Sequence, residues 1–270
     1  MKTITNRVCP FRPFSPSPFP PSVLAKAVRV TLVAIALAGA LPLLTAAYGQ
    51  ATARRMAEVN LRLAPPSLRA ALLAQREDLE RGLTEALRDY ASSSAEELAA
   101  EAQREFAGIP GLPSVQAPFG QVAYHFGKLA GLIYIANDPF ARSGDKRALE
   151  VHQDYLKYVE RKLPLLVFSF DGYSSPPLEG DLGRYLSTRM TGEGRYTEAV
   201  LFCYYPSGTR VSSDTFDDRS NAFGAAQVIL SHAVSDAAKA WLQVWKAMDG
   251  DLSSTPYLRR SEMKVAQKGK

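Results

Sequence analysis

Residues 121–136, QVAYHFGKLAGLIYIA, are apolar on nearly every side when they are wound as a helix. A helix that is apolar all round is stable in water only when other elements surround it. Gly127 and Gly131 lie four residues apart, so they would let a neighbouring helix approach closely. Asn137, Asp138 and Pro139 then end the segment. We therefore predict an all-α fold, a multi-helix globular bundle around this central helix.

Apolar residues at steps of three, four and seven predict further helices before and after the central one. We expect these helices at residues 52–63, 67–90, 94–108, 145–163, 180–190, 193–204 and 222–248. Ser94 and Glu97 form a capping-box pattern, residues 217–220 can cap the last helix, and Gly250 follows it at a C-cap position. Residues 108–120 contain three prolines and read as a loop, whereas residues 165–170 fit either a helix end or a strand.

Residues 30–48 carry no charge and follow Lys26 and Arg29. A basic segment, an apolar core and small residues at its end are typical of a secretory signal. We interpret residues 1–47 as such a signal, with a long proline-rich n-region and cleavage before Tyr48. The alternative is an uncleaved anchor, because about 20 apolar residues can span a bilayer. We thus expect an exported protein, periplasmic or secreted, or a single-pass protein that touches the membrane through its leader.

The charge balance changes once this leader is set apart. It holds five basic residues and no acidic one, so 32 minus 5 leaves 27 basic residues against 27 acidic ones. A neutral domain gives no electrostatic reason to expect nucleic acid as a partner. Cys203 is the only cysteine after residue 47, so a hydrophobic core must stabilise the fold. We expect one helical domain over residues 48–250 and a basic, flexible tail over residues 251–270.

The histidines are the candidate metal ligands, because the chain has no CxxC pair, HExxH, GxSxG or phosphate-binding glycine loop. His152 lies within the apolar stripe of the helix at 145–163. It is either a hydrogen-bonded core histidine or part of a site, since a buried imidazole needs partners. His125 lies on the central helix. Together with Asp138, these two histidines make the candidate metal site.

His232 and Asp236 are a second, weaker candidate. Their four-residue spacing places both on one helical face, where they can chelate a metal. The same face carries Lys239, Gln243 and Lys246, and His232 points away from the apolar side of the last helix. We therefore predict that this face is solvated.

The layout of the chain resembles a known superfamily at three places. These are the start of the expected domain at residues 48–53 (YGQATA), the phrase ANDPF at 136–140 and the ending at 216–245. They are similar to the exported zinc-dependent phospholipase C and single-strand nuclease superfamily, and the resemblance spans residues 48–250. It implies an all-helical fold and a zinc site that includes the amine of the mature terminus, here Tyr48.

The chain departs from that superfamily at its ligand positions. Tyr48 stands where the family has Trp, and the expected His and Asp ligands are replaced by Ala53, Gly131, Ile135 and Ala141. The resemblance thus implies a metal-depleted member with no cofactor, or with a single zinc ion on His125, Asp138 and His152. We expect a non-catalytic module that binds a lipid, an envelope component or another protein. The alternative is a metal-dependent phosphodiester hydrolase with a reduced metal site.

Overall fold

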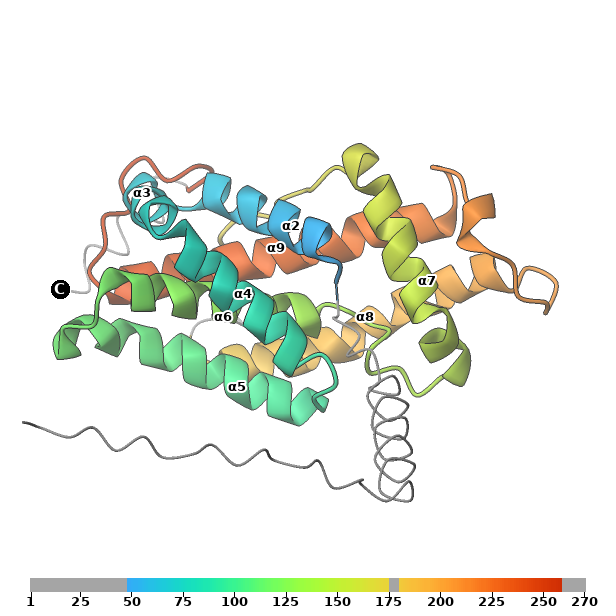
Figure 1. Cartoon of the computed structure of the whole chain (residues 1–270), viewed down its shortest axis with the longest axis horizontal. Helices are drawn as coiled ribbons and strands as arrows, with labels where there is room; N and C mark the ends of the chain where they lie inside the picture. Colours follow the sequence, from blue (N-terminus) through green and yellow to red (C-terminus); the bar gives the residue numbers. More distant parts are fainter. Residues whose placement is uncertain (1–47, 175–179, 259–270) are drawn as a thin grey trace, which may run out of the picture. The chain divides into compact units, whose positions relative to one another are not determined.

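The computed structural model describes residues 48–174 and 180–258. These two ranges contain eight α-helices and no strand, so the predicted all-α bundle is confirmed (Figure 1). Every described helix belongs to a single compact unit, which lies within residues 44–270. The predicted leader, residues 1–47, lies outside the described residues.

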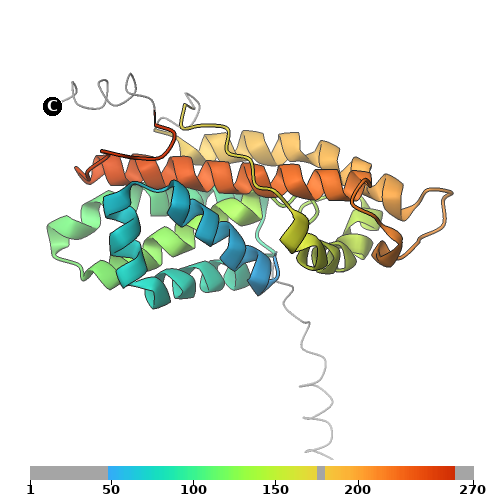
Figure 2. The same cartoon turned by 90° about the horizontal axis from the view of Figure 1, so that it is seen from above.

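The central helix is α6 (Phe119–Ala136), as the sequence predicts. Twelve of its 18 residues are buried. It packs against α4 (Arg76–Asp89), α5 (Ala95–Gly108), α8 (Leu182–Tyr204) and α9 (Asn221–Ala247). In Figure 2, α8 and α9 run side by side across the top of the view, and the helices that precede α6 lie below them.

Helices α4 and α6 approach each other closely through glycines. A Cβ atom placed on Gly127 would lie 2.0 Å from the carbonyl oxygen of Leu79 on α4. A Cβ atom on Gly82 of α4 would likewise lie 2.0 Å from the carbonyl oxygen of Tyr124 on α6. The close approach predicted at Gly127 is therefore confirmed, and Gly82 is its counterpart on the facing helix.

Two predictions of helix boundaries are wrong: one predicted helix is divided into two, and two predicted helices form one. The helix expected at 67–90 is divided into α3 (Pro66–Ala74) and α4, because Gln75 leaves the helical region at φ −122° and ψ 38°. No proline or glycine marks this break, which lets α4 lie along α6. Conversely, α8 runs unbroken through Gly192 and Gly194, because packing overrides the weak helix propensity of glycine.

The helix ends follow local side-chain chemistry. Ser94 and Glu97 form both bonds of the predicted capping box at the start of α5. Ser220 caps α9 by accepting a hydrogen bond from the Phe223 amide. At the other end of α9 it is Asp249, at φ 57°, that takes the left-handed conformation expected of Gly250. Gly250 instead donates to the carbonyl of Trp245 at 2.9 Å, which completes a Schellman motif.

The remaining helices are α2 (Gln50–Leu63) and α7 (Lys146–Lys162). Short 3₁₀ turns occupy Ile109–Val115, Leu163–Leu165 and Ser213–Thr215. The segment that follows Leu165 is neither helix nor strand, because its amides bind serine hydroxyls of α9. Ser169 donates to Ser231 at 3.0 Å, and Asp171 donates to Ser235 at 3.4 Å.

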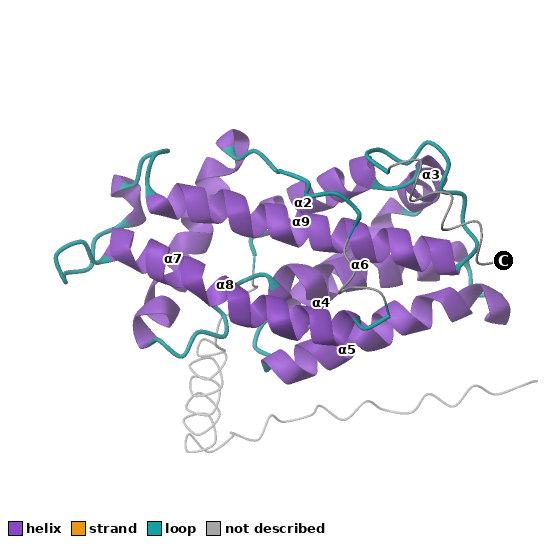
Figure 3. Cartoon of the chain, turned by 180° about the vertical axis from the view of Figure 1, so that it is seen from behind, coloured by secondary structure: helices purple, strands orange, loops and turns teal. Residues whose placement is uncertain are grey.

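Beyond α9, the described part of the predicted tail, residues 251–258, forms turns, and Thr255 there is only 7% exposed (Figure 3). The rest of the tail, residues 259–270, lies outside the described residues. No helix in the described ranges is long and apolar enough to cross a membrane.

Candidate functional site: a buried polar cluster and an adjacent apolar groove

His125 lies in an ion-pair network between α6 and α5. Its Nδ1 atom is 2.7 Å from Glu105 Oε2, and Lys128 Nζ lies 2.6 Å from both Glu105 Oε1 and Glu101 Oε1. Burial, the largest influence, raises the pKa of the Glu105 carboxyl, but the hydrogen bonds from His125 and Lys128 bring it below its usual range. The network satisfies its own charges, so His125 serves the packing of these helices.

Asp138 and His152, two of the three proposed metal ligands, lie in contact with each other. His152 Nε2 on α7 lies 2.8 Å from Asp138 Oδ2, just beyond the end of α6. The other carboxylate oxygen of Asp138 accepts from the Phe140 amide at 3.0 Å, and the Phe140 ring stacks on the His152 ring at 5.8 Å. His152 is only 8% exposed. This geometry is that of a hydrogen-bonded core histidine.

The third proposed ligand lies far from this pair. His125 and Asn137 are twelve residue steps apart, which corresponds to about 18 Å along the axis of α6. A zinc–nitrogen bond is about 2.1 Å long, so one ion cannot reach both His125 and the Asp138–His152 pair. Over residues 48–174 and 180–258, no group of three or more His, Cys, Asp or Glu side chains is placed to hold a metal ion.

The prediction that His232 and Asp236 lie on a solvated face is wrong. Asp236 is fully buried and Lys239 is 4% exposed. The reason is that α8 covers this side of α9, so the last helix is buried on two faces (Figure 3). Asp236 accepts from Arg189 Nε at 2.9 Å and from the Tyr185 hydroxyl at 2.5 Å. Asp236 therefore binds Arg189 and Tyr185 of α8 and does not form a pair with His232.

His232 uses a different partner on α8. Its Nδ1 atom lies 2.9 Å from Glu193 Oε1, and Glu193 is 1% exposed. Lys239, one turn beyond Asp236, pairs with Asp171 at 2.8 Å. The pair between Glu193 and His232 explains why a continuous α8 is favoured across Gly192 and Gly194: Glu193 lies between the two glycines and is held by α9.

Five polar atoms of the described residues are shielded from solvent and have no hydrogen-bond partner, and we call this set the buried polar cluster. These atoms are Tyr48 Oη, Thr52 Oγ1, Asn137 Oδ1, Arg142 Nε and Glu193 Oε2. Two of these residues, Tyr48 and Arg142, interact electrostatically with Asp138. Burial, then the charge of Asp138, raises the pKa of the Tyr48 hydroxyl well above its usual value. Burial lowers the pKa of Arg142, whose two terminal nitrogens donate to the Ile135 carbonyl at 3.1 Å.

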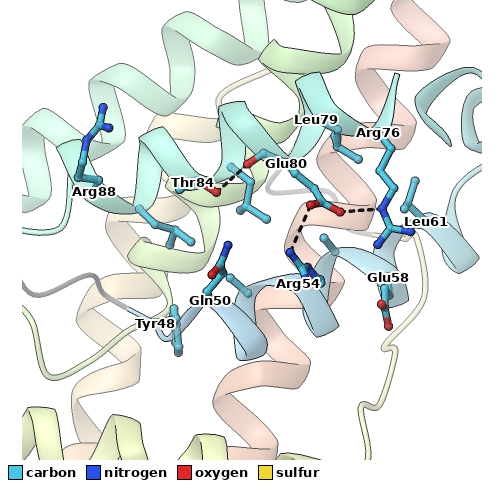
Figure 4. Close-up of a pocket in the computed structure, with 14 residues that line it drawn as sticks. Tyr48, Gln50, Arg54, Glu58, Leu61, Arg76, Leu79, Glu80, Thr84 and Arg88 are labelled. Atoms are coloured by element: carbon cyan, nitrogen blue, oxygen red, sulfur yellow. Dashed lines mark hydrogen bonds and ion pairs between the residues drawn. The ribbon is translucent and has the colours of Figure 1, made fainter. Parts of the chain in front are cut away.

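An apolar groove runs between α2 and α4, and Tyr48 lies at one end of it (Figure 4). Its volume is about 340 Å³. Its floor consists of small and branched apolar side chains that are each less than one-tenth exposed: Ala53, Ala57, Leu61, Leu79, Leu83 and Leu87. The glycines hold α4 against α6, whereas α2 presents the small residues Ala53 and Ala57, with Leu61 toward one end, to the leucines of α4. That mismatch in side-chain size leaves the groove open.

Charged side chains form the rim of the groove. Arg54 on α2 reaches Glu80 Oε2 at 3.5 Å, and Arg76 Nε on α4 lies 2.6 Å from Glu80 Oε1 (Figure 4). The side chains of Arg54 and Arg76 are 50% and 51% exposed. Arg88 lies toward the Tyr48 end and pairs with Asp89 through two nitrogens at 2.6 and 3.1 Å.

Sequence reasoning identified the helices on both sides of this groove but not the groove itself. The available signal was the pair Ala53 and Ala57, one turn apart, which gives α2 a flat face. Whether such a face lies against α4 depends on tertiary packing.

No protein family, curated protein or solved structure matches this chain. The resemblance to the zinc-dependent phospholipase C superfamily therefore stays a prediction. Of the positions it singles out, Tyr48 lies just before α2 and is 4% exposed. Gly131 and Ile135 are buried within α6, and Gly131 faces the Cβ atom of Ala86.

Proposed function

We propose that the helical domain is a non-catalytic binding module that takes a single hydrocarbon chain into the α2–α4 groove. The observation that carries this proposal is an open groove whose floor consists of apolar side chains that belong to the hydrophobic core. Ligand sites of this kind are mostly apolar with a few polar groups at fixed places. The arginines at the rim supply those polar groups.

The size of the groove decides between possible occupants. From Gln50 to Leu61 it follows eleven residue steps of α2, about 17 Å at 1.5 Å each. The groove has a volume of about 340 Å³ over that length. A helix of a partner protein is about 10 Å wide, so it would need several times this volume. A single alkyl chain is narrower than a helix and needs less volume.

The proposal includes the cell envelope as the place of action, because residues 1–47 read as a secretory leader. The apolar ligand in that compartment is a lipid or a lipid fragment. The phosphodiesterase alternative has less support. Asp138 and His152 bind each other, and His125 lies about 18 Å along α6 from that end of the helix.

Binding of decanol, which has one chain and no charge, tests the proposal. The purified full-length chain is compared with Ala57→Leu, which fills the floor of the groove, and with Ala100→Leu, which adds the same atoms to an exposed site on α5. If the new side chain displaces about two methylene groups at ~0.8 kcal/mol each, affinity falls roughly tenfold.

The control variant keeps the same leader, so any binding to the leader contributes equally to both variants. Circular dichroism and the melting temperature check that each variant is folded. Equal affinity of Ala57→Leu and Ala100→Leu, or no binding of decanol to the parent chain, would overturn the proposal.

A further inference from the structure

We infer that the groove selects a single-chain carboxylate of medium length, with its carboxylate at Arg54 and Arg76 and its tail directed toward Tyr48. This inference rests on the proposed function and adds the head group, the orientation and the chain length of the ligand. It follows from the difference between the two ends of the rim.

The Arg54–Arg76 end has unused hydrogen-bond donors. A guanidinium carries five N–H donors, and Arg76 binds Glu80 only through Nε. Arg54 uses one terminal nitrogen, at the long distance of 3.5 Å. Both side chains are about half exposed, so their remaining donors are open to a ligand. Two such groups side by side fit the two oxygens of one carboxylate.

Charge at this end favours one negative group. Glu80 is shared by Arg54 and Arg76, so the three side chains together carry one positive charge. Glu58, the other acidic residue of the groove, pairs with Arg55 at 3.4 Å. A single carboxylate therefore neutralises the site, whereas a doubly charged phosphate group would leave an excess of negative charge beside Glu80.

The other end of the rim is already satisfied. Arg88 is paired with Asp89 through two nitrogens, and its side chain points away from the groove in Figure 4. Beside it lie Leu87 and Tyr48, which offer apolar surface for a chain end. The carboxylate is thus placed at Arg54 and Arg76, and the tail runs toward Tyr48.

The distance between the two ends sets the length of the chain. Glu80 and Leu87 are seven residues apart on α4, which is about 10 Å. A fully extended peptide residue spans about 3.6 Å over three backbone bonds, so an extended alkyl chain advances about 1.2 Å per bond. The tail therefore has room for about eight carbons before it meets Tyr48 and Leu87.

The test compares decanoate with decanol on the full-length chain and on arginine variants. Arg54→Met and Arg76→Met keep the apolar stem but remove the charge, and Arg184→Met on an exposed turn of α8 is the matched control. We expect decanoate to bind at least tenfold more tightly than decanol. Each groove variant should lose most of that preference and still bind decanol, and Arg184→Met should keep it. Added salt should reduce the preference.

The possible failures are distinguishable. Equal binding of decanoate and decanol overturns the carboxylate inference and leaves the proposed function standing. Loss of the preference in Arg88→Met, and not in Arg54→Met or Arg76→Met, overturns the orientation. Affinity that keeps rising in carboxylates well beyond decanoate overturns the chain length. No binding of either probe rejects the proposed function itself.

Discussion

Replacing Gly127 by alanine should force α4 and α6 apart and destabilise the domain. The new Cβ atom would lie 2.0 Å from the Leu79 carbonyl oxygen, 2.9 Å from its carbon and 3.0 Å from the Leu83 nitrogen. All three are backbone atoms of α4, so no side-chain rotation relieves the clash. An ordinary carbon–oxygen contact is about 3.3–3.6 Å, so the helices must separate by more than an ångström.

The magnitude follows from two opposing effects. A gap of about 1 Å forfeits up to half of the dispersion energy of each contact across the interface, and overpacking a core costs about 1–3 kcal/mol or more. Alanine is the better helix former by about 1 kcal/mol, which offsets only part of this loss. We expect Gly127→Ala to lower the free energy of unfolding by about 2–3 kcal/mol.

Urea unfolding followed by circular dichroism measures this change, and the chain offers a matched control. Gly192 lies within α8 and has open space where a Cβ atom would stand. Gly192→Ala should therefore raise stability by up to about 1 kcal/mol, so the same substitution has opposite signs at the two sites. Equal midpoints for Gly127→Ala and Gly192→Ala would refute the close approach of α4 and α6.

Two further predictions concern charges. Asp236→Asn should lower the free energy of unfolding by about 3 kcal/mol in a denaturant titration, because it breaks a buried ion pair, whereas Asp89→Asn at an exposed pair should change it little. The Glu105 carboxylate, whose folded pKa is lowered, stabilises the fold above the usual glutamate value of about 4.3, and this stabilisation is lost as pH falls through the folded pKa. The stability difference between the parent chain and Glu105→Gln should therefore shrink below about pH 4; a constant difference would contradict the assignment.

The sequence predicted the elements of the fold because their signals are local. The all-round apolar character of residues 121–136 required surrounding helices, and Ser94 and Glu97 marked the start of α5. The break at Gln75 and the continuity of α8 have no such signal, since they depend on which helix lies alongside.

The difference between local signals and tertiary packing also explains which features of the candidate site could be predicted. Asp138 and His152 lie together because one follows the central helix and the other lies on the apolar stripe of the next, whereas His125, the third proposed ligand, lies about 18 Å away along α6. His232 and Asp236 were misplaced because a periodic pattern assigns one buried face to a helix, and α9 has two. The groove was missed because its width depends on the spacing of α2 and α4, which no single segment encodes.

Photo-crosslinking with a decanoate that carries a photoreactive group at its tail tests the central claim most directly. We predict that mass spectrometry finds the label on peptides from Gln50–Leu63 and Arg76–Asp89, concentrated near Leu87, and that excess decanoate prevents it. Labelling that falls mainly on α7, α8 or α9, or that excess decanoate does not reduce, would contradict a hydrocarbon chain in the α2–α4 groove.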